Sequence, residues 1–251
     1  MLKLIITVTM FMTALLAQAQ VSETRKAGNF SKIEVASGIE LRYKETQDEA
    51  SIKVEANEGS LTNIITEVEG ETLKISTKGK AKNIKVFVSA RDIESFKAIS
   101  KSKIIFVNTI HTENISIALE SGAYFKGYFK SNNYTNIETG ADTEFNGRIE
   151  TTSFKGDFKS HSKINISGNA QKATIRSASK AYCNARNFLT EKTEVDSDNS
   201  IVIITSKNNI NINATDNASV TYFGSPKKAS IENESLIDTK KYKRPTLIAM
   251  D

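Results

Sequence analysis

A short pattern that recurs from residue 98 onward limits the fold of this chain more than any other feature. The pattern runs apolar, any, Ser or Thr, any, small, any, apolar, and residues 98–104, 119–125 and 158–164 are clear copies. Its third position falls at Ser100, Ser121, Thr139, Ser160, Ser177, Ser197, Thr215 and Asn233. Subtracting these numbers gives intervals of 17 to 21 residues, and a nearly fixed period of about 20 residues is typical of a solenoid.

Within each copy, apolar and polar residues alternate with a period of two, which is the period of a β-strand. In one copy, Phe158, Ser160, Ser162 and Ile164 share a face that excludes the lysines between them. The alternation therefore predicts that small hydroxyl residues form an inward stack where each coil turns. A hydroxyl buried there needs a partner in the backbone or in the next coil.

One copy cannot bury its own apolar face, but the next coil stacked on it can. We therefore predict an all-β fold: a parallel β-helix of right-handed winding, with repeats of about 20 residues over residues 96–240. Residues 28–95 read instead as short alternating strands separated by turn residues. This region is predicted to form an N-terminal β cap or irregular first coils, because an open coil end exposes unpaired strand groups.

The two ends of the chain differ from the repeats. Residues 1–19 combine one lysine, an apolar run and a small-residue site ending at Ala19, which predicts a secretory signal peptide. The apolar run is shorter than the roughly 20 residues that span a bilayer, and we expect the mature chain to lack a transmembrane segment. Residues 241–251 begin with a basic tract and are predicted to form a frayed tail. The expected location is periplasmic, cell-surface or extracellular.

The charge balance limits the classes of partner that the sequence predicts. The formal net charge is +5, and the charged residues are mixed along the chain. No basic stripe with interleaved aromatic residues is present, so nucleic-acid binding is not predicted. A mildly basic exported protein would be attracted to acidic glycans or an anionic cell surface.

Catalytic signatures are missing from the sequence. It contains no nucleophile elbow, no paired cysteines and no phosphate loop. The histidines, His111 and His161, are too few for a His-rich metal site, and Cys183 falls on the predicted inner face as a structural thiol. We expect no cofactor and no metal.

Two arrangements of side chains on neighbouring coils could still form a functional site. Carboxylates on neighbouring coils could meet at a spacing suited to glycoside hydrolysis, with Glu120, Glu138 and Asp142 as the candidates. Because lysines and arginines lie one coil away from these carboxylates, the favoured interpretation is a solvated ladder of ion pairs. Outward tyrosines could instead form a sugar platform, although Tyr124 and Tyr182 lie three coils apart in the predicted register.

The opening of the mature chain carries a family resemblance. It consists of Phe30, Ile33, Val35, Ser37, Gly38 and Ile39, followed by strands at residues 73–75 and 84–86 and then by serial Ser-Gly-Ala repeats. This combination resembles the family called putative auto-transporter adhesin, head GIN domain, a domain of unknown function in secreted proteins of Bacteroidetes. The resemblance covers residues 28–235 and implies a β-helical fold and a surface location. It supplies no functional residues, and Lys101, His161 and Ala178 replace glycine in several repeats.

We therefore predict an exported, non-enzymatic surface or envelope protein that binds glycans or other envelope proteins. A carbohydrate-active enzyme using the Glu120, Glu138 and Asp142 region is one alternative, and a purely structural envelope component is another. The sequence leaves the oligomeric state open.

Overall fold

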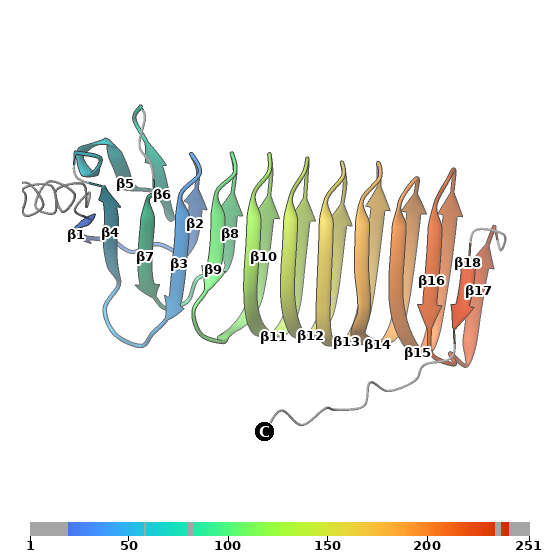
Figure 1. Ribbon diagram of the computed structural model, residues 1–251. Coiled ribbons are helices and arrows are strands. Elements are labelled where there is room, and N and C mark those ends of the chain that lie inside the picture. The colour runs from blue at the N-terminus through green and yellow to red at the C-terminus, as the bar shows by residue number, and fades with distance from the viewer. Residues whose placement is uncertain (1–19, 58, 80–82, 234–236, 241–251) are drawn as a thin grey trace, which may run out of the picture.

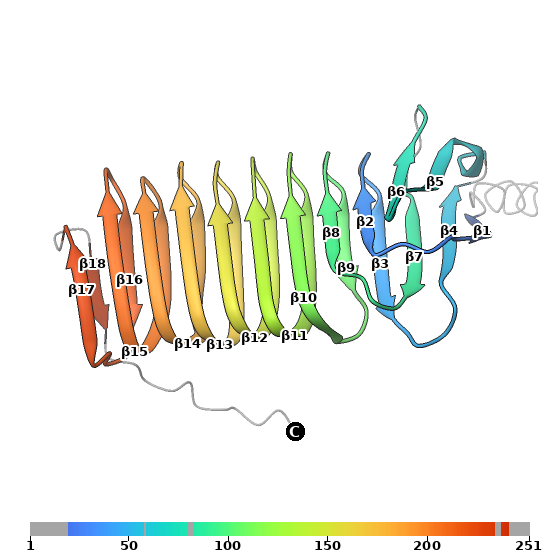
Figure 2. The same ribbon diagram turned by 180° about the vertical axis from the view of Figure 1, so that it is seen from behind.

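The computed structural model describes residues 20–57, 59–79, 83–233 and 237–240. The protein is an elongated solenoid in which short coils stand side by side along one axis (Figures 1 and 2). This all-β solenoid confirms the fold class predicted from the repeats. The predicted signal peptide, residues 1–19, and the basic tail, residues 241–251, lie outside the described residues.

The regular coils are built from long strands that bend once. Around the bend, as between Ser131 and Tyr134, the pairing register shifts, and it then resumes on the other side of the coil. We call the first halves of these strands sheet 1 and their second halves sheet 2. The strands are β10 (Ile110–Leu119), β11 (Tyr124–Thr139), β12 (Glu144–Phe158), β13 (Lys163–Ala178), β14 (Tyr182–Asp198) and β15 (Ile201–Thr215). Each pairs in parallel with the next.

Three short strands continue the stack at its C-terminal end. Strand β16 (Ser219–Phe223) extends sheet 1, and β17 (Lys228–Glu232) extends sheet 2. Strand β18 (Ile237–Lys240) then pairs in parallel with β16. The parallel pattern thus holds to the last described strand.

The N-terminal coils are stacked out of sequence order. Strands β2 (Lys32–Val35) and β3 (Glu40–Glu45) form one coil. On one side of it lies the coil formed by β6 (Thr72–Thr77) and β7 (Lys85–Ala90). On its other side lies the coil formed by β8 (Ser95–Ala98) and β9 (Lys103–Phe106). The chain therefore lays down the β2–β3 coil first and later adds a coil on each side of it. In sheet 1, β7, β3 and β9 precede β11, and in sheet 2, β6, β2 and β8 precede β10.

Antiparallel strands cover the N-terminal end. Strand β4 (Ser51–Asn57) pairs antiparallel with both β1 (Gln20–Lys26) and β7, and β5 (Ile64–Glu69) pairs antiparallel with β6 after the short helix η2 (Leu61–Asn63). The N-terminal region thus combines antiparallel strands with coils that are stacked out of sequence order.

The core lies between the two sheets and follows the predicted alternation. In β12, for example, Phe145, Ile149, Phe154 and Phe158 are fully or almost fully buried. Rings of successive coils stack, as Phe125 and Phe145 do with centroids 4.7 Å apart. Burying a side chain of this size contributes about 2 kcal/mol, so the coil-to-coil stack carries most of the stabilisation.

The repeated hydroxyl positions do not form the single inward stack that the alternation predicted. Ser100, Ser121 and Ser160 sit in the tight turns that join the sheets, with φ near +54°. Ser100 and Ser121 are exposed, as are Thr215 and Asn233. Thr139, Ser177 and Ser197 are buried in strands, where Ser177 pairs with Phe158 and Ser197, and Phe158 pairs with Thr139.

The physical reason is the conformation of the turn. In the copies with Ser100, Ser121 and Ser160, that residue and the one after it both have positive φ, which breaks the alternation between inward and outward residues. The backbone nevertheless stacks in register there, because the Lys101 N–H donates to the Ser121 carbonyl at 2.9 Å, and His161 donates to the Ser179 carbonyl at 3.1 Å. Ser160 therefore aligns with Ser179 and not with Ser177.

Buried hydroxyls do line both edges of the core, although at other positions of the repeat. Near the turns, Ser200 Oγ donates to the Ser177 carbonyl at 2.8 Å, and Thr139 Oγ1 donates to Ser162 Oγ at 3.0 Å. Near the bends, Ser131 Oγ lies 2.8 Å from Thr135 Oγ1 and 2.7 Å from Thr151 Oγ1. These buried hydroxyls pair with the backbone or with another hydroxyl, whereas Ser177 Oγ is buried and has no hydrogen-bond partner among the described residues.

Replacing Gly168 by Ala should destabilise the solenoid by about 3 kcal/mol, because both strain and a clash oppose it. Gly168 has φ +111°, and an added Cβ would lie 2.0 Å from the Ile149 carbonyl oxygen in the neighbouring coil. Urea unfolding of Gly168→Ala measures the effect. Gly140→Ala is the matched control, because its nearest atom would be 3.6 Å away. Equal midpoints for the two variants would contradict this packing.

Replacing Ser131 by Ala should lower the free energy of unfolding by about 1–2 kcal/mol, because two buried threonine hydroxyls lose a partner. Thermal unfolding followed by circular dichroism would measure the loss. Ser219→Ala, at an exposed outward position, should leave the transition within a degree or two of the parent. A Ser131→Ala transition that does not move would argue against the hydroxyl rows.

Candidate functional site

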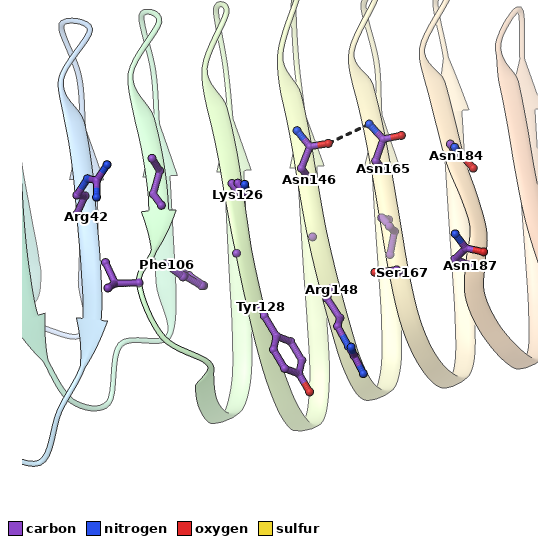
Figure 3. A pocket seen from close by; sticks show the side chains of 15 residues that line it. Arg42, Phe106, Lys126, Tyr128, Asn146, Arg148, Asn165, Ser167, Asn184 and Asn187 are labelled. Carbon is purple, nitrogen blue, oxygen red and sulfur yellow. Dashed lines mark hydrogen bonds between the residues drawn. The ribbon is translucent and has the colours of Figure 1, made fainter. Parts of the chain in front are cut away.

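A shallow groove of about 880 Å³ crosses the outward face of sheet 1 (Figure 3). Its lining comes from β3, β9 and the first halves of β11 to β14, so the groove runs along the solenoid axis and across the strands. The side chains that concern its chemistry are Arg42, Lys126, Tyr128, Asn146, Arg148, Asn165 and Asn184. Most carry an amide or a positive charge.

A row of polar side chains forms the floor of this groove. Lys126 pairs with Asn146, Asn146 with Asn165, and Asn165 with Asn184 in the parallel register. We call these four residues the amide row. Because neighbouring strands lie about 4.8 Å apart, the row presents one polar group per coil at a regular spacing.

Hydrogen bonds orient the amides of this row. Asn165 Nδ2 donates to Asn146 Oδ1 at 3.0 Å, and Asn146 Nδ2 donates to Glu144 Oε1 at 2.8 Å. Asn184 Oδ1 accepts the Arg186 backbone N–H at 3.3 Å. Each amide has both donors and acceptors, and all three asparagines line the groove.

A charged cluster reaches the groove through Tyr128 and Arg148, which are part of its lining. Tyr128 OH donates to Glu150 Oε1 at 2.6 Å, and Lys130 Nζ lies 3.0 Å from Glu150 Oε2. These bonds, first from Tyr128 and then from Lys130, hold the pKa of the Glu150 carboxyl below its usual range. The Arg148 guanidinium lies 4.9 Å from the centre of the Tyr128 ring, so the aromatic ring is fixed by charged neighbours.

The carboxylates that the sequence suggested as catalytic candidates lie outside this groove. Glu120 and Glu138 line a depression of about 180 Å³ on sheet 2, together with Asp157 and Lys159, whereas Asp142 is not part of it. Glu138 Oε1 accepts a hydrogen bond from Asn136 at 2.9 Å, and Glu120 Oε1 lies 3.6 Å from Lys97 Nζ. The structure thus brings two of the three candidates together.

Ion pairs between neighbouring coils form the predicted ladder on sheet 2. Arg176 lies 3.7 Å from Asp196, and Lys172 lies 3.9 Å from Glu194. Both pairs, like Lys97 with Glu120, are solvent-exposed and join one coil to the next, so each contributes at most about 1 kcal/mol. Opposite charges on successive coils therefore neutralise one another on this face.

The remaining candidates do not assemble into a site. Tyr124 and Tyr182 face outward three coils apart, with Glu144 and Lys163 between them in the register. Tyr222 is buried. Among the described residues, no group of three or more His, Cys, Asp or Glu side chains is arranged to hold a metal ion, and no helix there has the length and apolar character needed to cross a membrane.

Comparison with known proteins identifies the family of this chain. Its sequence matches the family described as putative auto-transporter adhesin, head GIN domain, over residues 29–226. The chain belongs to this family. No curated protein matches it.

Several solved structures share its fold. A structure described as a putative adhesin from Parabacteroides distasonis superposes with a TM-score of 0.80 at 14% identity, covering 90% of this chain and 96% of that one. A putative lipid binding protein from the same species gives 0.74 at 16% identity, covering 90% and 98%. A putative adhesin from Bacteroides fragilis gives 0.63 at 16% identity, covering 90% and 95%. The family and these neighbours are named as adhesins or binding proteins rather than as enzymes.

Cys183 should resist thiol reagents until the protein unfolds. Complete burial raises the pKa of this thiol from 9.0 to about 12, which lowers its thiolate fraction at pH 8 by about a thousandfold. Ellman's reagent should therefore react with the native protein far more slowly than with protein in 6 M guanidinium chloride. Rapid, stoichiometric labelling of the folded protein would contradict the buried position.

Proposed function

We propose that this protein is exported and acts at the cell surface or envelope as an adhesin-like module that binds an extended glycan in the groove of sheet 1. The amide row, Lys126 with Asn146, Asn165 and Asn184, is the observation that carries this proposal. Amide groups donate and accept hydrogen bonds, as the hydroxyl groups of sugars also do.

The shape of the groove supports a long ligand over a compact one. The groove crosses several coils, so successive sugar units would meet successive polar side chains. Many weak contacts along one polymer add to a useful avidity, and a binding surface of this kind needs no catalytic group.

Export is supported by the signal-like pattern of residues 1–19, and a surface or envelope location by the family to which the chain belongs. One structural neighbour is described as a putative lipid binding protein. The groove in this chain combines amides and cations with apolar side chains such as Ile105, Val107 and Ile166, and the amides and cations suit a hydroxylated polymer better than an acyl chain.

Retention on immobilised polysaccharides tests the proposal. Purified mature protein should bind at least one of dextran, xylan, mannan, polygalacturonate and methyl-esterified polygalacturonate. Asn165→Ala combined with Asn184→Ala should weaken that binding about thirtyfold, because two hydrogen-bonding amides are lost at about 1 kcal/mol each.

Asn211→Ala is the matched control, because Asn211 is an exposed outward asparagine of sheet 2. This variant should bind like the parent. The proposal fails if no polysaccharide is retained, or if Asn211→Ala weakens binding as much as the double variant in sheet 1.

A further inference from the structure

The two faces of the solenoid differ in how their charges are neutralised. On sheet 2, four cations have a carboxylate partner on the same or the next coil, in the pairs Lys97–Glu120, Lys159–Asp157, Lys172–Glu194 and Arg176–Asp196. The outward Lys155 and Lys192 of this sheet form no ion pair with another described residue. On sheet 1, the outward cations of β3, β9, β11, β12 and β13 are Arg42, Lys44, Lys103, Lys126, Lys130, Arg148 and Lys163, and the outward carboxylates are Glu40, Glu144 and Glu150. Sheet 1 therefore retains a positive charge.

Three lysines account for much of this excess. Lys103, Lys126 and Lys163 form no ion pair with another described residue, and all three are exposed. Lys126 stands in the amide row itself. Lys103 and Lys163 stand in the neighbouring outward row, which runs Lys103, Tyr124, Glu144, Lys163 along the coils.

The ion pairs on sheet 1 do not cancel its excess of positive charge. Arg42 lies 2.7 Å from Glu40, but Lys130 and Arg148 share the single carboxylate of Glu150, at 3.0 Å and 3.5 Å. One carboxylate between two cations leaves a net positive charge at the side of the groove. Glu144 accepts a hydrogen bond from Asn146 and offsets only part of the lysine charge.

We propose that the glycan held in this groove is anionic, with carboxylate, sulfate or phosphate groups that meet Lys126, Lys103 and Lys163. This inference rests on the proposed function and names the class of its ligand. Lys103 and Lys163 are three strand spacings apart, or about 14 Å, so their charges suit a polymer with repeated anionic groups. The amides of Asn146, Asn165 and Asn184, in the neighbouring outward row, serve the neutral hydroxyls of the same polymer.

An anionic membrane surface would also be attracted by the charge but fits the face poorly. Stable binding to a lipid surface needs apolar side chains that enter the interface. Of the large hydrophobic residues that are exposed in the described part of the chain, Val107, Tyr134 and Ile201, only Val107 lines the groove. The amides and cations of the groove fit a solvated polymer instead.

Calorimetry with acidic polysaccharides tests this inference. Polygalacturonate, hyaluronate and chondroitin sulfate are titrated into the mature protein, with methyl-esterified polygalacturonate as the uncharged counterpart of the first. At least one acidic polymer should bind at least tenfold more tightly than the methyl ester. Raising NaCl from about 0.05 M to about 0.5 M should weaken that binding about tenfold, because the Debye length falls from more than 10 Å to about 4 Å.

Reversing the charge of lysines on sheet 1 tests whether these lysines cause the preference for acidic polymers. Lys126→Glu with Lys163→Glu should lower the affinity at least tenfold and leave the thermal transition within a few degrees of the parent. Lys192→Glu changes an exposed lysine of sheet 2 and should alter the affinity less than twofold.

The other outcomes separate the two proposals. Binding of the methyl ester as tight as that of polygalacturonate would overturn the anionic ligand and leave glycan binding intact. Failure of every polysaccharide, charged or neutral, would overturn both. Binding to phosphatidylglycerol vesicles with no binding to the acidic polymers, or an equal loss in Lys192→Glu, would also overturn the inference.

Discussion

Parallel pairing of each coil with the next, at one strand spacing and with register shifts confined to a few irregular positions, is the constraint on which the rest of the structure depends. A slip of one residue would turn every inward side chain outward, and the buried phenylalanines of β11 and β12 would face water. The turns reinforce the register through backbone bonds from coil to coil, as between Lys101 and Ser121. Core, hydroxyl rows and outward rows are all consequences of this single alignment.

The same alignment gives each face its chemistry. On sheet 2 it sets Arg176 beside Asp196, so that opposite charges meet. On sheet 1 it sets Asn146 beside Asn165, so that amides bond to one another across a shallow groove. A solenoid therefore needs no special loop to build a binding surface, because one residue type repeated at the coil period becomes a row.

The repeat and its period of two predicted the parallel coils, the inward phenylalanines and the pairing of buried hydroxyls. They misplaced Ser100, Ser121 and Ser160, because a tight turn with positive φ interrupts the alternation that the prediction extended through it. The position of the β2–β3 coil between two later coils was not predictable, since it depends on contacts between Ile33 and both Leu73 and Phe96, far apart in sequence. The amide row gives only a weak signal in the sequence: Asn146, Asn165 and Asn184 are 19 residues apart, but asparagines are frequent throughout the chain, so this interval does not stand out.

A distance between two spin labels tests the in-register winding most directly. Lys103 and Ile201 are exposed members of one outward row and are separated by five successive strand pairings, through Tyr124, Glu144, Lys163 and Tyr182. At about 4.8 Å per pairing, cysteines introduced at these two positions and labelled with nitroxides, in a chain whose Cys183 is replaced by Ala, should give a single narrow pulsed-EPR distance near 24 Å, broadened by the label linkers. A distance beyond about 35 Å, or a broad distribution with no peak near 24 Å, would contradict the stacking of these coils.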